Sequence, residues 1–360
     1  MTRLLTCGWE TGDISEAGTH PAIPANSTVT FVSTVPTPRA GVYAMKVATS
    51  ASSLSAWAKV FLLPAAKTDI WLRFGFFVHA ASTSGTTEMP LIEVQNSGAS
   101  VQGQITWNAA DGLMRAYRGT TTGTLLGTST TPLAQDVWHT IELRYQITSL
   151  TAGTVEVWLD GNRQINFSGD NTNASSLPDV QTIRLGTMSS VTAVANQTYV
   201  AFDDIAINDT LGTLNNGRAG DGRVLLLAPN GAGSSTQLAR GGTDTGANYS
   251  QVNETPPSMT QYVGSANVGD RDLYTMSDIS GVVVQSVNVV EELLLAQNSD
   301  STGGSIAPTI KSGATINEAT AVALATGAAY FLARWETDPN TGAAWTATAI
   351  NALEAGATVR

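Results

Sequence analysis

Apolar and polar residues alternate along much of the first 208 residues, in short runs separated by clusters of Gly, Ser, Thr, Asn and Asp. The clearest run spans residues 69–79. Its even-numbered positions from 70 to 78 are all apolar: Ile70, Leu72, Phe74, Phe76 and Val78. Successive side chains of a β-strand point to opposite faces, so this run predicts a strand whose apolar face lies in the core.

Further runs with the same alternation predict strands at 42–49, 57–63, 91–95, 101–107, 113–117, 138–147, 154–159, 164–167, 182–185 and 198–207. Roughly a dozen strands are too many for one open antiparallel sheet and favour two stacked sheets, a sandwich of the jelly-roll kind. The strongest hairpin joins residues 155–159 to 163–167, because Asp160-Gly161 supplies the positive φ angles of a tight turn.

Turn-forming residues dominate between Asn208 and Arg223, and we place a linker at 211–222. The linker divides a β-sandwich domain, residues 1–210, from a smaller β-rich domain, residues 223–360. In the second domain we expect strands at 224–227, 272–276, 282–295, 306–311 and 328–335, and a long glycine-rich loop at 232–248.

A helix is predicted over residues 343–355, close to the end of the chain. Trp345, Ala349, Ala352 and Leu353 recur there at helical spacing, and Gly356 stands at the expected stop. The sequence therefore predicts an all-β protein in which the second domain ends in a short helix.

The charge balance excludes several partners. The chain has 18 Lys and Arg residues and a net charge of −11, so it has no basic surface for nucleic acid or an anionic membrane. The most apolar later stretch, residues 282–296, is interrupted by polar residues, whereas a membrane span needs roughly 20 apolar residues. Residues 1–10 hold too few apolar residues for an export signal. We expect no membrane insertion.

Cysteine and histidine offer little chemistry. The single cysteine, Cys7, cannot form an intramolecular disulfide, and we expect a buried structural thiol. His20, His79 and His139 are too scattered for a metal site, and His139 reads as a packed, hydrogen-bonded residue. The sequence has neither a Gly-x-Ser-x-Gly elbow nor a phosphate loop. We therefore predict no catalytic residue, no metal and no cofactor.

Two carboxylate pairs are the remaining candidates for chemistry. Glu156 and Asp160 are the nearest pair for glycoside hydrolysis, but their spacing favours solvated carboxylates at a strand edge. Asp203 and Asp204 are adjacent, so strand alternation sends them to opposite faces and they cannot share a proton. One of them could ligate calcium, although a buried, hydrogen-bonded aspartate is the favoured interpretation.

Outward-facing tryptophans are candidate contacts. Trp71 and Trp158 occupy the polar faces of their predicted strands. There they could stack on sugar rings or lie in contact with another subunit or domain. We name them as contact residues for a glycan or a neighbouring subunit.

Three segments together resemble the laminin-G/concanavalin-like jelly roll over about the first 208 residues: residues 138–145 (WHTIELRY), 155–161 (VEVWLDG) and 202–208 (FDDIAIN). The rest is similar to the C-terminal part of tailed-bacteriophage virion proteins. That similarity lies in residues 248–254 (NYSQVNE), Pro256-Pro257, 270–274 (DRDLY), 335–346 (WETDPNTGAAWT) and 351–356 (NALEAG). The resemblance implies a structural protein on the particle exterior, a capsid decoration or a fibre or tail component without catalysis.

The leading hypothesis is therefore a virion structural protein that acts through assembly contacts and is not an enzyme. We expect a homo-oligomer, first of all a trimer, that binds the major capsid or tail proteins and is assembled in the host cytoplasm. The alternative is a carbohydrate-binding adhesin for host surface glycans. A depolymerase is the third hypothesis.

Overall fold

The computed structural model of the protein describes residues 3–17, 27–49, 57–80, 88–173, 177–186, 198–242 and 245–360. The chain forms two compact units, Met1–Val224 and Leu225–Arg360. Within the described residues, no helix is both long and apolar enough to span a membrane.

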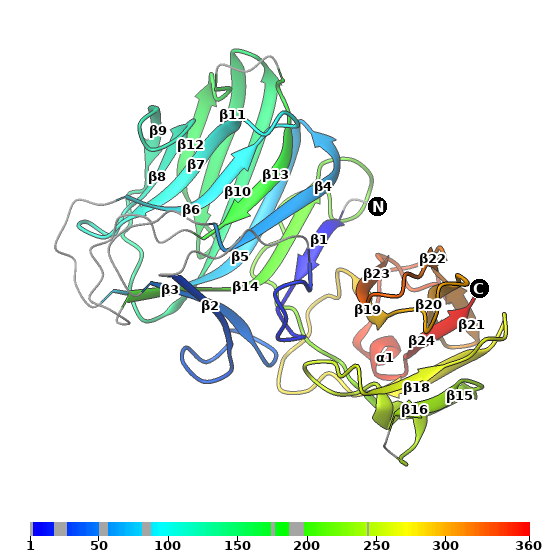
Figure 1. Ribbon diagram of the computed structural model, residues 1–360. Helices are drawn as coiled ribbons and strands as arrows, with labels where there is room; N and C mark the ends of the chain where they lie inside the picture. The colour runs from blue at the N-terminus through cyan, green and yellow to red at the C-terminus, as the bar shows by residue number, and fades with distance from the viewer. Residues whose placement is uncertain are drawn as a thin grey trace. The chain divides into compact units, whose positions relative to one another are not determined.

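The first unit consists of two antiparallel sheets (Figure 1). Sheet A has the order β12 (Asn162–Gly169), β11 (Ala152–Leu159), β10 (Trp138–Ser149), β5 (Asp69–Ala80), β14 (Thr198–Asp209), β3 (Ala44–Thr49) and β2 (Ser27–Val32), and β1 (Arg3–Cys7) also pairs with β14. Sheet B has the order β4 (Lys59–Lys67), β13 (Val180–Leu185), β6 (Glu88–Gln95), β7 (Val101–Asn108), β8 (Met114–Arg118) and β9 (Thr124–Thr128). The predicted all-β sandwich is confirmed.

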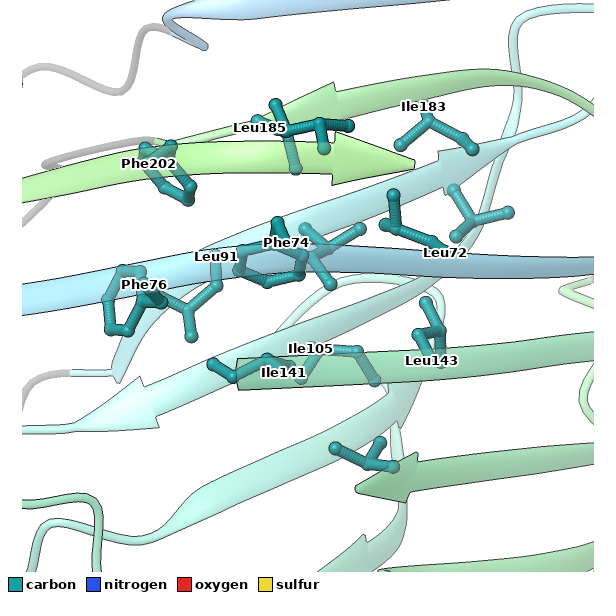
Figure 2. Packing of buried hydrophobic residues seen from close by; sticks show 14 of the residues in the cluster. Leu72, Phe74, Phe76, Leu91, Ile105, Ile141, Leu143, Ile183, Leu185 and Phe202 are labelled. Atoms are coloured by element: carbon teal, nitrogen blue, oxygen red, sulfur yellow. The ribbon is translucent and has the colours of Figure 1, made fainter. Parts of the chain in front are cut away.

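The core of this unit lies between the two sheets. The apolar face predicted for residues 69–79 is confirmed, since Ile70, Leu72, Phe74, Phe76 and Val78 are all buried. Figure 2 shows side chains of β5, β10 and β14 meeting those of β6, β7 and β13. Because each buried side chain removes apolar surface from water, this packing fixes which face of every strand points inward.

The predicted hairpin is also confirmed. β11 and β12 pair antiparallel from Gly153↔Gly169 to Leu159↔Asn162, with one register shift between Val157 and Trp158. The turn residues Asp160 and Gly161 have φ angles of 48° and 80°. Both values lie in the left-handed region, which Asp tolerates and Gly adopts freely, so local sequence chemistry dictates this turn.

The second unit is built on sheet C, in the order β15 (Pro229–Thr236), β18 (Arg271–Met276), β24 (Glu354–Val359), β20 (Ser305–Ser312) and β21 (Thr315–Glu318), with β22 (Val322–Ala323) paired to β20. Two ribbons accompany it, β16 (Ala239–Gly242) with β17 (Gln261–Gly264), and β19 (Val290–Ala296) with β23 (Ala329–Trp335). The glycine-rich loop predicted at 232–248 is wrong, since this stretch holds β16, parts of β15 and the 3₁₀ helix Asn248–Gln251. No strand forms at residues 224–227.

The C-terminal helix is shorter than predicted. Helix α1 spans only Ala347–Asn351, and residues from Glu354 onward form β24. β24 is hydrogen-bonded on one side to β18 and on the other to β20. A central strand gains ladder hydrogen bonds along both edges, and these outweigh the helical spacing of the apolar residues. Trp345 is nevertheless buried, as expected, and its Nε1 donates to the Trp335 carbonyl oxygen at 2.9 Å.

Gly356 gives a test of the central strand. A Cβ at this position would lie 2.2 Å from the Asp272 backbone oxygen. We expect Gly356→Ala to destabilise the second unit by about 1–3 kcal/mol, because the neighbouring strand must move. Hydrogen exchange in β18 and β20 should accelerate accordingly. Gly327→Ala is the matched control, since no atom lies within 4 Å of its added Cβ. Equal exchange in the two variants would contradict the pairing.

Candidate functional site

A row of side chains crosses the outer face of sheet B from one edge to the other. Its members occupy consecutive register positions on all six strands: Val60, Arg184, Glu93, Gln104, Tyr117 and Leu125. We call this set the cross-strand row. The two end positions are apolar, and the four between them carry hydrogen-bonding groups. Such a row is produced by strand register alone, from residues far apart in the sequence.

Glu93 is the centre of the cross-strand row. Its Oε2 accepts a hydrogen bond from Gln104 Nε2 at 2.7 Å, and its Oε1 accepts one from Gln95 Nε2 at 2.8 Å. Arg184 Nη1 lies 3.2 Å from the same Oε1. The backbone N–H of Thr121 donates to Gln104 Oε1 at 3.1 Å. The carboxylate therefore fixes the orientation of two amides and a guanidinium on three strands.

A second carboxylate, Glu88, is held beside the row at the other end of β6. It accepts hydrogen bonds from Thr106 Oγ1 and, at 3.1 Å, from Asn108 Nδ2. Arg115 Nη1 lies 3.2 Å from Glu88 Oε1, and Arg115 Nη2 lies 2.5 Å from Asp111. Burial raises the pKa of Tyr117, and the charge of Glu88 and a hydrogen bond to it add to the rise. The phenol therefore stays protonated and can donate.

These groups form two layers on the sheet. Glu93, Gln95 and Gln104 are buried, whereas the side chains of Arg184 and Glu88 are 33% and 19% exposed. The buried layer holds the half-buried layer in fixed rotamers, which lowers the entropy lost when a ligand binds. Chemically, the face offers amide, guanidinium, phenol and carboxylate groups in a line, which suits hydrogen bonding to hydroxyl groups.

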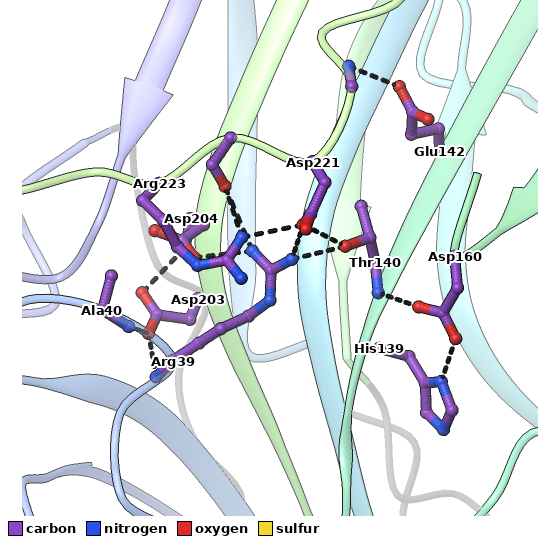
Figure 3. A network of polar contacts seen from close by, with 12 residues as sticks. Arg39, Ala40, His139, Thr140, Glu142, Asp160, Asp203, Asp204, Asp221 and Arg223 are labelled. Carbon is purple, nitrogen blue, oxygen red and sulfur yellow. Dashed lines mark hydrogen bonds and ion pairs between the residues drawn. The ribbon is translucent and has the colours of Figure 1, made fainter. Parts of the chain in front are cut away.

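The chain itself covers part of the outer face of sheet A. Residues 217–224, which we call the covering segment, lie over β10 and β11. Arg218 Nε donates to Glu142 Oε2 at 3.0 Å, and Gly220 N donates to Glu142 Oε1 at 2.9 Å. Thr140 donates to Asp221 at 2.6 Å, as seen in Figure 3. The second half of the segment that the sequence predicts as a linker, residues 217–222, thus packs on the sandwich.

The expectation that Asp203 and Asp204 point to opposite faces is wrong. Asp204 has a φ of 53°, and the register of β14 shifts between Asp203 and Ala206. This bulge brings both carboxylates to one basic residue, since Arg39 N donates to Asp203 at 2.9 Å and Arg39 Nη1 to Asp204 at 2.8 Å (Figure 3). Both aspartates are buried and hydrogen-bonded, as the favoured interpretation held.

The predicted contact residues Trp71 and Trp158 both lie on the outer face of sheet A. The Trp158 ring has the Arg218 guanidinium 3.9 Å from its centroid and that of Arg163 at 5.6 Å. Trp71 has the Arg144 guanidinium at 5.5 Å. Both rings are half-buried. Their contact with a glycan or subunit stays a prediction, but Arg218 of the covering segment already occupies one face of Trp158.

The other candidate residues from the sequence have structural partners. Glu156 is buried and pairs with Arg163 at 2.8 Å, so the expectation of a solvated carboxylate is wrong for Glu156 but confirmed for Asp160, which is exposed. Asp160 accepts from Thr140 N at 2.8 Å and contacts His139 Nδ1 at 2.6 Å, and His139 is packed as predicted. Cys7 is a buried free thiol. His20 lies outside the described residues. Among the described residues, no group of three His, Cys, Asp or Glu side chains is arranged to hold a metal ion.

The residues of the cross-strand row were missed from the sequence. The sequence does contain a signal for them, because every second position along the two strands is polar. These positions are 93 and 95 on β6 and 102, 104 and 106 on β7. Glutamate and glutamine are not strand-favouring residues, so their regular placement in two strands indicates a role other than strand formation. The sequence does not reveal that these runs are neighbours in one sheet.

Comparison with protein families and with curated proteins finds no match to this sequence. Solved structures do resemble it. A cellulose-induced protein is 17% identical and covers 61% of this chain and 100% of its own, with a TM-score of 0.45. An endo-β-1,4-glucuronan lyase from Trichoderma reesei is 14% identical over 57% of this chain and 95% of its own, also with a TM-score of 0.45. A carbohydrate esterase from the Shiga toxin-encoding bacteriophage phi24B is 17% identical over 57% and 97%, with a TM-score of 0.40.

These similarities concern the fold alone, at identities of 14–17%. They correct one expectation. The conclusion that the chain is not an enzyme rested on the absence of a familiar constellation in the sequence, yet two of these similar structures are enzymes that act on carbohydrates. The expectation that the chain is not an enzyme is therefore withdrawn.

Glu10 lies near the aspartates of β14 and is a buried carboxyl of which only one oxygen is hydrogen-bonded within the part of the chain that the structure describes. Its Oε2 accepts from Val42 N at 2.7 Å, while Oε1 has no hydrogen-bond partner among the described residues. Burial raises the pKa of Glu10 to about 8, and the charges of Glu16 and Asp204 add to the rise. The folded state thus favours the neutral acid.

The raised pKa of Glu10 predicts a pH dependence of stability. A carboxyl whose pKa is higher in the folded state contributes stability that is complete below its unfolded pKa and is lost as pH rises toward about 8. We expect Glu10→Gln to flatten the decline between about pH 5 and pH 8, by at most about 1.4 kcal/mol per pH unit. Urea unfolding of both proteins across this range measures it, and parallel curves would contradict the assignment.

Proposed function

We propose that the first unit binds glycan chains across the outer face of sheet B. The observation that carries the proposal is the cross-strand row, in which Glu93 holds Gln95, Gln104 and Arg184 in fixed positions on adjacent strands. A polar network this well connected on the outer face of a sheet is more than strand pairing requires. Its half-buried outer groups are the ones available to a ligand.

The dimensions of the row suit an extended ligand. Six strands at about 4.8 Å spacing give a line of about 24 Å across the sheet. A polysaccharide presents hydroxyl groups repeatedly along its length and has flat apolar ring faces. Arginine and amide side chains bind such hydroxyls, and Tyr117 offers an aromatic ring in the middle of the face.

A second part of the proposal concerns assembly. We propose that the second unit attaches the glycan-binding unit to a phage particle and to copies of itself, with a trimer as the first expectation. The support is the sequence resemblance of residues 335–346 and 351–356 to phage virion proteins, together with a small core. Among the described residues, the cluster of the second unit has seven buried hydrophobic residues, against 39 in the first. A unit with so small a core gains stability from neighbours.

The ribbon of β19 and β23 is the best surface for that assembly. Register pairs Leu293↔Leu332 and Leu295↔Tyr330 place apolar side chains on one face, and Leu294↔Phe331 places them on the other. Leu332 is 39% exposed, and the other five are half-buried. The face with Leu294 and Phe331 also carries Val290, Ala333 and Trp335, which belong to the core of the second unit or pack against it. The face with Leu332 is therefore the one open to a partner.

Glycan binding is tested by a glycan array probed with the full chain, followed by calorimetry on the best ligand. We expect Tyr117→Ala to weaken binding at least tenfold, because an aromatic ring is lost from the centre of the row. Trp71→Ala is the matched control on sheet A and should bind as the wild type does. No glycan bound by the intact protein would refute the proposal. Loss of binding only in Trp71→Ala would show that the site lies on sheet A, which carries the contact residues predicted from the sequence.

Assembly is tested by analytical ultracentrifugation of the full chain. The wild type should sediment as an oligomer, and Leu332→Lys should shift it to the monomer, since a charge cannot be buried unpaired in an apolar contact. Val268→Lys changes an exposed apolar residue outside the ribbon and should leave the mass unchanged. A monomeric wild type at high concentration, or dissociation by both variants, would contradict this assignment.

A further inference from the structure

We infer that the glycan recognised by the outer face of sheet B is uncharged; this inference rests on the proposed function and names its ligand class. The charged side chains on this face are Glu88, Glu93, Arg115 and Arg184, and their formal charges cancel. Asp111, which pairs with Arg115, adds one negative charge. The face therefore has no positive charge to spare for an acidic polysaccharide.

Each arginine on the face is already paired. Arg184 lies 3.2 Å from Glu93, and Arg115 lies 3.2 Å from Glu88 and 2.5 Å from Asp111. To bind a sugar carboxylate, either guanidinium would have to share or leave a partner that is partly or fully buried. Withdrawing the counter-ion from a buried carboxylate is costly, so the pairs resist this exchange.

The charge balance does not depend on the residues outside the described ranges. In the first unit, those residues include no Lys, Arg, Asp or Glu. The whole chain has a net charge of −11, so its long-range field also repels a polyanion. Local pairing and the overall field thus disfavour the same ligands.

What remains on the face suits a neutral sugar. The guanidinium N–H groups not used in ion pairs can donate to hydroxyl oxygens, and the carboxylates can accept from hydroxyl groups without a change of charge. The Tyr117 ring can contact the apolar face of a sugar ring. Bonds of this kind hardly respond to salt, whereas the binding of a polyanion weakens as salt screens the charges.

The experiment is affinity electrophoresis and calorimetry of the full chain with two sets of polysaccharides. The neutral set is β-glucan, xylan and galactan, and the acidic set is alginate, polygalacturonate and hyaluronan. We expect binding to a member of the neutral set, with affinity changed less than twofold between about 50 mM and about 500 mM salt. Binding only to the acidic set, weakened by salt, would overturn this inference and leave the proposed function standing. No binding to either set or to the glycan array would overturn the proposed function itself.

A charge variant tests the cause. Glu93→Gln keeps the shape of the side chain and leaves Arg184 without its counter-charge. We expect this variant to gain salt-sensitive binding to acidic polysaccharides, at least tenfold above the wild type. Glu156→Gln is the matched control, because it removes the partner of Arg163 and Arg144 on sheet A and should gain none. Equal behaviour of the two variants would show that pairing by Glu93 does not set the ligand class.

Discussion

The packing of sheet A on sheet B is the constraint on which the rest of the first unit depends. Strands alternate their side chains, so burying Phe74, Phe76 and Phe202 on one side and Ile105 and Ile183 on the other settles the direction of every neighbour. The direction of the outward side chains then follows from the packing of the inward ones. Register between strands places them in rows, and the chemistry of a row follows from which residues the core has turned outward.

The two outer faces show different uses of this constraint. On sheet A, outward polar groups such as Glu142 and Thr140 are satisfied by the covering segment, so that their hydrogen bonds close the surface. On sheet B, Glu93 and Glu88 are satisfied by side chains of the sheet itself, which leaves Arg184 and Tyr117 half-exposed above them. The same alternation thus gives one face that the protein uses for its own stability and one that can be used for binding.

The sequence predicts well what is decided locally. The apolar face of residues 69–79 and the Asp160-Gly161 turn follow from alternation and from backbone preference, and both are confirmed. Prediction from the sequence fails where contacts between distant segments determine the local structure. Residues from Glu354 onward have a helical spacing of apolar residues but gain more from pairing with two strands. The bulge at Asp204 breaks an alternation that the sequence gives no reason to doubt. The candidate site could not be predicted from the sequence for the same reason, because Arg184 and Glu93 become neighbours only through the order of strands in the sheet.

The proposed ligand class and the proposed assembly depend on each other energetically. A face whose ions are already paired would bind a neutral chain through hydrogen bonds and one aromatic contact, and each such bond exchanges with water for a small net gain in free energy. The affinity of one such site for a glycan would then be low. Several copies held on one particle convert later binding events into intramolecular ones, which raises the overall affinity by orders of magnitude without any new contact. A weak neutral-glycan site would therefore gain most if the second unit supplied many copies, as the proposed assembly does.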